Sequence, residues 1–148
     1  MISIQSDDFD VGKEYQALKE SADGDGAIVT FTGLVRDMCE SGSVSGISLE
    51  HYPGMAEKSL MEICTKARQR WSLGNIRIIH RVGELAASEH IVFVGVTSKH
   101  RHDAFEACEF LMDYLKTRAP LWKKEITAAG AIWVEAKQTD HDAAAVWG

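Results

Sequence analysis

The chain has few of the residues that build disulfide scaffolds or structural metal sites. Its 148 residues include only three cysteines, Cys39, Cys64 and Cys108, and none belongs to a Cys-x-x-Cys pair. An odd number of widely spaced thiols argues against a disulfide framework and against a structural zinc site. Because Cys64 and Cys108 lie on apolar faces of predicted helices, we interpret them as small buried hydrophobic residues.

Long apolar runs are also missing. No stretch approaches the roughly 18 apolar residues needed to cross a membrane. The acidic start, MISIQSDDFD, lacks the apolar segment of a secretory signal. We therefore expect a cytoplasmic protein without membrane contact. No Gly-x-Gly-x-x-Gly follows a predicted strand, which disfavours a Rossmann dinucleotide-binding unit.

Positive charge is the minority sign, with 16 Lys and Arg against 22 Asp and Glu and a net charge of -6. This balance argues against a broad basic surface for nucleic acid. Six of the sixteen cations nevertheless fall between Lys99 and Lys124. A locally basic site on an acidic protein suits a small anionic ligand. The length and the 45% hydrophobic content fit one globular domain spanning residues 1–148.

A predicted helix lies between two groups of these cations. The strand His90–Thr97, rich in β-branched residues, leads into it, and Asp103 with Glu106 forms a capping-box pattern. Ala119-Pro120 ends the helix, because the residue before proline avoids the α region. Its ends carry Lys99, His100 and Arg101 on one side and Lys116, Arg118, Lys123 and Lys124 on the other.

The remaining elements predict an α+β fold with three main helices. Neighbouring strands without helical crossovers indicate a mixed or antiparallel sheet. The polar segment 36–46 is predicted to be a long loop, residues 83–88 a turn, and the C-terminal tail a loose helix or a docking segment. The other helices are predicted at 8–21 and 56–71, and the other strands at 1–5, 27–35, 47–52, 75–82 and 131–136.

Several side chains suit anion chemistry. Arg36 directly follows a strand and suits bidentate phosphate contact, and His100 with Arg101 precedes a helix, where anions bind favourably. Lys116 lies on a largely apolar helix, where partial desolvation would lower its pKa and make it an acid, a base or a nucleophile. For each residue the alternative is a solvated surface charge. The pattern alone therefore predicts a small-anion site of open chemistry.

Two further residues complete this interpretation. Lys123 follows Pro120 and Trp122, a rigid apolar approach that would fix its direction. His100 and His102 could present two imidazoles together, but no third ligand stands at a suitable spacing. We therefore predict no metal site.

Five long motifs resemble the large, catalytic subunit of molybdopterin synthase, and the similarity extends from about Phe9 to Trp147. The motifs are FTGLVRD at 31–37, LEHYPGMAEK at 49–58, HRVGEL at 80–85, VFVGVTSKHRHDAFEA at 92–107 and MDYLKTRAPLWKKE at 112–125. The resemblance implies a hammerhead-type α+β fold. It also implies a dimer of large subunits that binds a small ubiquitin-like subunit at each outer end, giving a heterotetramer.

The resemblance further implies a sulfurtransferase reaction. The small subunit ends in a Gly-Gly thiocarboxylate and donates sulfur to cyclic pyranopterin monophosphate. Two transfers form the molybdopterin dithiolene and open the cyclic phosphate. We expect no bound cofactor, and no catalytic cysteine, because the partner supplies the sulfur. The implied catalytic residues are Lys116 and Lys123, and the implied substrate-binding residues are Arg36, His100, Arg101, Lys116, Lys123, Lys124 and Glu125.

Helix geometry separates the two cation clusters of one chain. Arg101 and Lys116 stand about 22 Å apart along one helix at 1.5 Å per residue. A small pterin cannot touch both ends, so either the clusters serve different sites or a second copy supplies one of them. The dimer that the resemblance implies favours the second option, and we predict that one copy supplies Arg36, Lys116 and Lys123 and the other His100 and Arg101. The alternative is that the two clusters bind unrelated anions or none.

Two positions depart from the family pattern. Leu34 stands where the family often has a basic residue, and Lys137 where some relatives have Arg.

The competing class of function is a non-enzymatic module that only docks the ubiquitin-like partner. The number of spread cations exceeds what a groove for its tail needs, which favours the enzyme.

Overall fold

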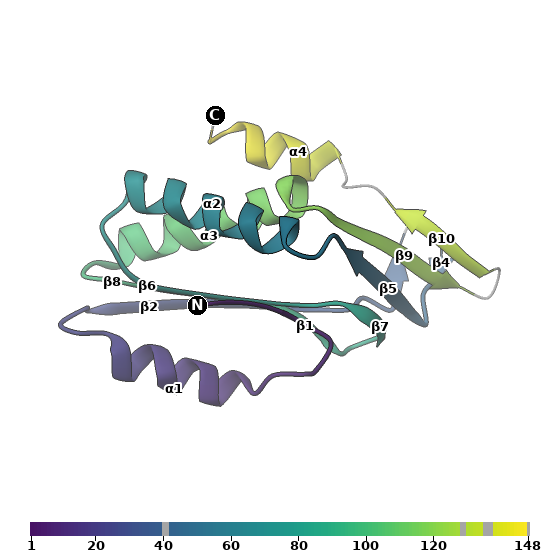
Figure 1. The fold of residues 1–148 in the computed structure, drawn as a ribbon, viewed down its shortest axis with the longest axis horizontal. Coiled ribbons are helices and arrows are strands. Elements are labelled where there is room, and N and C mark those ends of the chain that lie inside the picture. Colours follow the sequence, from purple (N-terminus) through teal and green to yellow (C-terminus); the bar gives the residue numbers. More distant parts are fainter. Residues whose placement is uncertain (40–41, 128–129, 135–137, 148) are drawn as a thin grey trace.

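A four-stranded sheet with helices on both faces forms one half of the structure, and a second four-stranded sheet extends from its end (Figure 1). The computed structural model describes residues 1–39, 42–127, 130–134 and 138–147. The strands are β1 (Ile2–Gln5), β2 (Ala27–Leu34), β3 (Met38–Cys39), β4 (Gly42–Ser43), β5 (Gly46–His51), β6 (Leu73–Arg81), β7 (Gly83–Ala86), β8 (His90–Ser98), β9 (Leu121–Thr127) and β10 (Gly130–Val134). The helices are α1 (Val11–Ser21), α2 (Met55–Arg70), α3 (Arg101–Arg118) and α4 (Gln138–Ala145).

The first sheet has the strand order β1-β6-β8-β2, in which β1 pairs with β6 in parallel and the other pairs are antiparallel. Its central strand β8 is apolar on both faces because helices cover both. Val94 faces the core beneath α2 and α3, whereas Phe93 packs with Leu18 on the side of α1. The α1 helix therefore lies on the opposite face from α2 and α3 (Figure 1).

The second sheet, β10-β9-β5-β7, is antiparallel throughout. The chain enters it from β6 through Gly83, whose φ of 89° is left-handed and favours glycine. Ile47 and Leu49 of β5 pack with Val35 and Leu85 in a small apolar cluster. This cluster joins the second sheet to the end of β2.

Acidic side chains bind free backbone N–H groups at the starts of α1 and α2. The Asp10 carboxylate accepts from the Lys13 backbone N–H at 3.0 Å and caps α1. At the start of α2, the Gly54 N–H donates to Glu57 at 2.6 Å. Beyond α4, the Trp147 indole donates to Asp113 of α3 at 2.7 Å. The C-terminal segment is thus tied to α3 by a polar contact as well as by ring packing against Phe110.

The predicted α+β class is confirmed, but the prediction of three main helices is wrong, because the described residues contain four. The fourth helix, α4, lies in the tail that the sequence left as either a loose helix or a docking segment. Its stability comes from α3 rather than from its own short sequence, since isolated helices of this length are marginal in water.

Four local predictions also need correction. Residues 83–86 form strand β7 rather than part of a turn, because they pair with β5. The α3 helix begins at Arg101 with His100 as N-cap, so Asp103 lies in its first turn. The segment after Pro120 is strand β9, which was not predicted because its adjacent charged residues interrupt the alternation of apolar and polar side chains. Part of the predicted loop 36–46 is the short β3-β4 pair, and residues 40–41 lie outside the described ranges.

Among the helices of the described segments, none combines the length and the apolar character that a membrane crossing requires.

Candidate functional site

Arg36 lies immediately after β2, at the junction of the two sheets. Val35, just before it, is buried in the apolar cluster with Leu49 and Leu85. The Val35 N–H donates to the Glu89 carbonyl at 2.9 Å, and its carbonyl accepts from the Ser88 N–H at 2.8 Å. The Arg36 side chain is exposed. Its backbone is therefore anchored while its guanidinium is open to a ligand.

Lys116 occupies the last turn of α3, the end that points toward the second sheet (Figure 1). Its side chain is 44% exposed, and its ammonium lies 3.8 Å from the Asp140 carboxylate of α4. Lys116 is thus more open to solvent than its apolar helix suggested. The expectation of a desolvated lysine is not met in the single chain, and any desolvation must come from a ligand or a second chain.

Strand alternation separates the three candidates of β9. Lys123 pairs with Leu49 and Glu125 with Ile47, and both β5 partners face the apolar cluster. Lys124 points to the opposite face, because side chains alternate along a strand. There it lies 4.2 Å from the Trp133 ring centre and 4.0 Å from Glu50. Lys123 and Glu125 therefore share the face next to the apolar cluster that holds Val35, and Lys124 lies on the other face.

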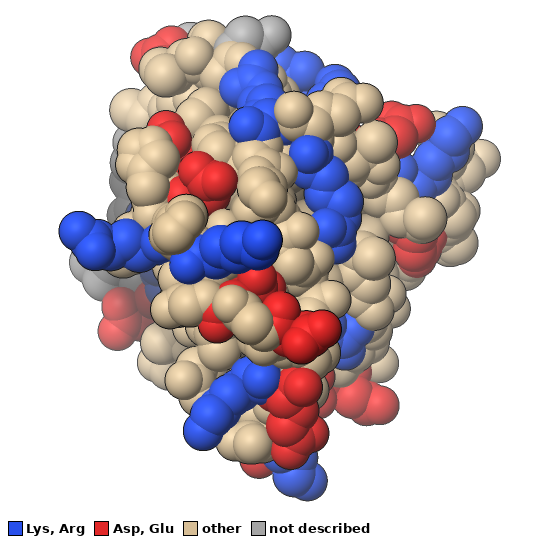
Figure 2. All heavy atoms as spheres, turned by 90° about the vertical axis from the view of Figure 1, so that its left-hand side faces the viewer, with Lys and Arg blue, Asp and Glu red and all other residues tan. Residues whose placement is uncertain are grey.

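His100 and Arg101 lie at the far end of α3, and both are exposed. The side chain of His100, the N-cap residue, makes no capping hydrogen bond. Figure 2 views this end of the molecule and shows Lys and Arg side chains interspersed with Asp and Glu. This face therefore carries both positive and negative charges. Within one chain, His100 and Arg101 are separated from Lys116 by nearly the whole helix.

The described thiols are poorly suited to nucleophilic catalysis. Cys64 and Cys108 are buried in the core between the first sheet and its two covering helices. Burial raises the pKa of both thiols to about 11, so neither ionises appreciably at neutral pH. Their predicted burial is confirmed. The side chain of Cys39 and the whole of Lys137 lie outside what the structure describes.

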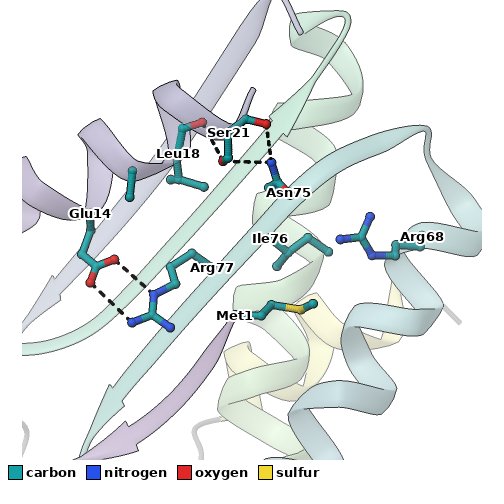
Figure 3. Close-up of a pocket in the computed structure, with 9 residues that line it drawn as sticks. Met1, Glu14, Leu18, Ser21, Arg68, Asn75, Ile76 and Arg77 are labelled. Carbon is teal, nitrogen blue, oxygen red and sulfur yellow. Dashed lines mark hydrogen bonds and ion pairs between the residues drawn. The ribbon is translucent and has the colours of Figure 1, made fainter. Parts of the chain in front are cut away.

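One open depression of about 400 Å³ lies between α1, β6 and the end of α2 (Figure 3). Its arginines are already engaged: Arg77 binds Glu14 at 3.1 Å, and Arg68 donates to the Gly74 carbonyl at 2.8 Å. None of the residues predicted for the site lines it. This depression is therefore separate from the candidate site.

A second groove, of about 390 Å³, runs between β2 and α3. Phe31 and Phe105 line it and are 42% and 60% exposed. Large apolar side chains left open in a groove are typical of a surface that another chain covers. Glu109 and Asp113 place acidic groups at the same groove.

The amino-acid sequence matches one protein family over most of its length. A family model described as MoaE protein matches residues 4–118. The chain belongs to the MoaE family. It is 53% identical over 146 residues to the molybdopterin synthase catalytic subunit of Vibrio cholerae, covering 99% of this chain and 97% of that protein. It is 58% identical over 139 residues to the protein of the same name from Escherichia coli, covering 94% and 92%.

Solved structures of the MoaE family share the fold. The molybdopterin biosynthesis MoaE protein from Burkholderia ambifaria superposes with a TM-score of 0.85 at 48% identity, covering 100% of this chain and 97% of that one. A protein–protein complex of subunits 1 and 2 of molybdopterin-converting factor from Helicobacter pylori contains a chain with a TM-score of 0.76 at 21% identity, covering 92% and 91%. That last likeness concerns the fold alone.

Sequence reasoning missed two contributors to this region. Asp140 contacts Lys116 from 24 positions further along the chain, and no spacing pattern signals such a pair. A turn was predicted over residues 83–88, but its backbone bonds from Ser88 and Glu89 to Val35 were not foreseen, because these residues lie more than fifty positions from Val35.

Proposed function

We propose that this chain is the catalytic subunit of a molybdopterin synthase. It transfers sulfur from the thiocarboxylated C-terminus of a small ubiquitin-like subunit to cyclic pyranopterin monophosphate and so forms the dithiolene. The observation that carries the proposal is that the last turn of α3, with Lys116, comes directly before β9, whose Lys123 and Glu125 share the face next to the apolar cluster that holds Val35, the residue before Arg36. The names of relatives that match nearly the whole chain support it.

The residues divide the chemistry between them. Arg36 binds the cyclic phosphate, because a guanidinium forms bidentate bonds to phosphate oxygens. Lys116 and Lys123 stabilise negative charge at the thiocarboxylate and at the reacting carbon, or transfer protons there. Glu125 contacts substrate from the same face as Lys123, whereas Lys124 faces away from it. The nucleophilic sulfur belongs to the partner, which agrees with the buried state of Cys64 and Cys108.

The site is shared between two copies of the chain, which associate through the groove between β2 and α3. Five residues form one stripe along α3 at intervals of three or four, the spacing of one helix face. They are Arg101, Phe105, Glu109, Met112 and Lys116. The central members line the groove, and the outer two are the separated cations.

An antiparallel pairing of two α3 helices about an axis between Cys108 and Glu109 matches this stripe to itself. Phe105 of one copy then faces Met112 of the other, and Arg101 of one copy faces Lys116 of the other. The exposed apolar side chains are covered, and the cation clusters are brought together. A two-fold contact of this kind is self-complementary, as closed dimers require.

Reconstitution tests the proposed reaction. The purified chain, the thiocarboxylated small subunit and cyclic pyranopterin monophosphate are mixed, and the dithiolene product is measured by mass spectrometry. We expect product only when all three are present. The control is a small subunit ending in an ordinary carboxylate, which should bind but yield no product. Tight binding of the thiocarboxylated partner without product would instead establish a docking module.

A further inference from the structure

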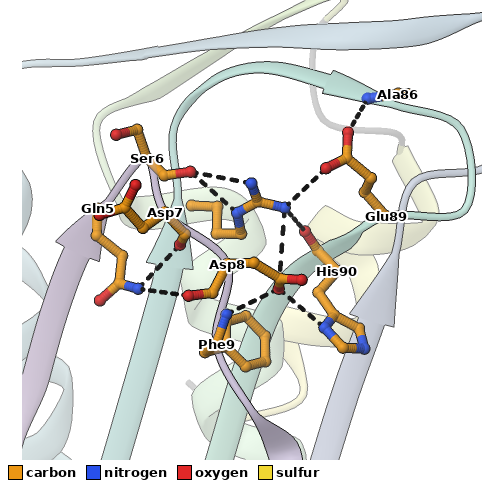
Figure 4. A network of polar contacts seen from close by, with 9 residues as sticks. Gln5, Ser6, Asp7, Asp8, Phe9, Ala86, Glu89 and His90 are labelled. Carbon is orange, nitrogen blue, oxygen red and sulfur yellow. Dashed lines mark hydrogen bonds and ion pairs between the residues drawn. The ribbon is translucent and has the colours of Figure 1, made fainter.

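Arg81, at the end of β6, is a buried cation outside the residues assigned to the reaction. Its side chain is 8% exposed. Its Nε and Nη2 donate to the Ser6 carbonyl at 3.1 and 3.0 Å, and its Nη1 donates to the His90 carbonyl at 3.0 Å (Figure 4). Asp8 lies 4.0 Å away. A buried guanidinium with this many partners fixes the backbone segments that it joins.

One of those partners leads toward the site. The Arg81 Nη1 also donates to the Glu89 carboxylate at 3.3 Å, and the other oxygen of that carboxylate accepts from the Ala86 N–H (Figure 4). These bonds lower the pKa of Glu89, the Ala86 bond most strongly. Glu89 thus spans both ends of the short turn between β7 and β8 and ties it to Arg81.

The same turn binds the backbone of Val35, the residue before Arg36. The Glu89 carbonyl accepts from the Val35 N–H, and the Ser88 N–H donates to the Val35 carbonyl. Ser88 makes this bond with a φ of 71°, a left-handed conformation that non-glycine residues seldom adopt. Both polar backbone groups of Val35 are therefore bound by a turn whose shape depends on Glu89.

We propose that Arg81 and Glu89 are positioning residues for Arg36, acting through the turn 86–89 and the backbone of Val35. The inference rests on the proposed role of Arg36 as the phosphate ligand. An exposed arginine binds a phosphate in a defined direction only if its backbone is rigid, since small displacements of a binding group weaken substrate binding and orientation. The buried guanidinium supplies that rigidity.

Steady-state kinetics of the complete enzyme test this inference. Arg81→Lys keeps the charge but loses the fork of donors, and Glu89→Gln replaces one acceptor oxygen by a donor. Each should raise KM for cyclic pyranopterin monophosphate about three- to tenfold with kcat little changed, less than Arg36→Ala does. Hydrogen exchange at the Val35 and Ser88 amides should become faster in both variants.

The decisive measurement combines each change with Arg36→Ala. If Arg81 and Glu89 act through Arg36, Arg81→Lys and Glu89→Gln should have no further effect on KM in the Arg36→Ala background. The matched control is Arg77→Lys on the same strand, which loses the forked guanidinium contact with Glu14 and should leave KM unchanged. If Arg81→Lys fails to fold, Glu89→Gln provides the same test from a side chain that is 42% exposed.

Two outcomes would contradict the positioning role. Equal factors in KM for Glu89→Gln with and without Arg36, or an unchanged KM, would overturn the positioning role while leaving the proposed function intact. An Arg36→Ala protein with unchanged KM would instead remove the phosphate role from the proposed function, and this inference with it.

Discussion

The ammonium of Lys116 lies 3.8 Å from the carboxylate of Asp140, and this ion pair joins the last turn of α3 to α4. Both side chains are partly exposed, at 44% and 25%. Exposed pairs of this kind contribute at most about 1 kcal/mol to stability. The pair therefore gives Lys116 a structural contact whose effect must be separated from the proposed catalytic role.

Replacing Lys116 by Ala should lower turnover at least about a hundredfold, because a positioned acid–base or electrostatic group is lost. Folding should be almost unchanged. The control is Asp140→Asn, which breaks the same ion pair but keeps the ammonium and should retain most activity. Comparable losses of turnover in both variants would assign Lys116 to holding α4 rather than to catalysis.

Replacing Arg36 or Arg101 by Ala should chiefly raise KM, because each is proposed to bind the phosphate. The difference from the unchanged protein should shrink at high salt, where charges are screened beyond about 3 Å at 1 M. Initial rates over a range of substrate and salt concentrations provide the measurement. A loss of stability with KM unaffected would make these arginines structural.

Mixing an Arg101→Ala protein with a Lys116→Ala protein should restore activity after the subunits exchange. In a shared site, each mixed dimer keeps one intact site, made by Lys116 of the first variant and Arg101 of the second. Product formation should follow the fraction of mixed dimers, measured independently by native mass spectrometry. Confirmed exchange without recovered activity would place both clusters in one chain's site and contradict the shared arrangement.

Acid should destabilise the fold through His80. Burial is the main cause that lowers the pKa of this imidazole from 6.5 to about 4. Between these values the unfolded chain binds a proton that the folded chain does not, so the free energy of unfolding falls as pH drops from 6.5 toward 4. The total loss from this group is about 3 kcal/mol.

Urea unfolding of the His80→Gln variant at several pH values should therefore show a shallower dependence in that window, even though the variant is less stable at neutral pH. The control His141→Gln removes an exposed imidazole and should keep the slope of the unchanged protein. An equal slope in His80→Gln would mean that other groups cause the acid sensitivity.

Converting Cys39, Cys64 and Cys108 to Ser should leave the chemistry intact, because the proposed sulfur comes from the partner. Stability should fall, since a buried hydroxyl without a partner costs about 1–3 kcal/mol. Turnover per folded molecule, with the folded fraction taken from circular dichroism, separates the two effects. A folded triple variant that makes no product would require a thiol in the mechanism.

Much of the fold could be read from local patterns. The β-branched residues of His90–Thr97 predicted a strand, and Ala119-Pro120 predicted the end of α3, because both signals arise from neighbours in sequence. Strands β7 and β9 were missed since their stability comes from pairing with β5, which lies more than thirty positions away along the chain. Short or highly charged strands carry little local signal when distant partners define them.

The amino-acid sequence by itself determined the α+β class, the main helices, the burial of Cys64 and Cys108 and the choice of cations suited to an anion. Only the tertiary structure decided how these cations are grouped. The register of β9 on β5 turned Lys123 toward the apolar cluster and Lys124 away, and the docking of α4 brought Asp140 to Lys116. The physical reason is that side-chain type and helical spacing are local properties, whereas strand register and helix docking depend on the packing of the whole core.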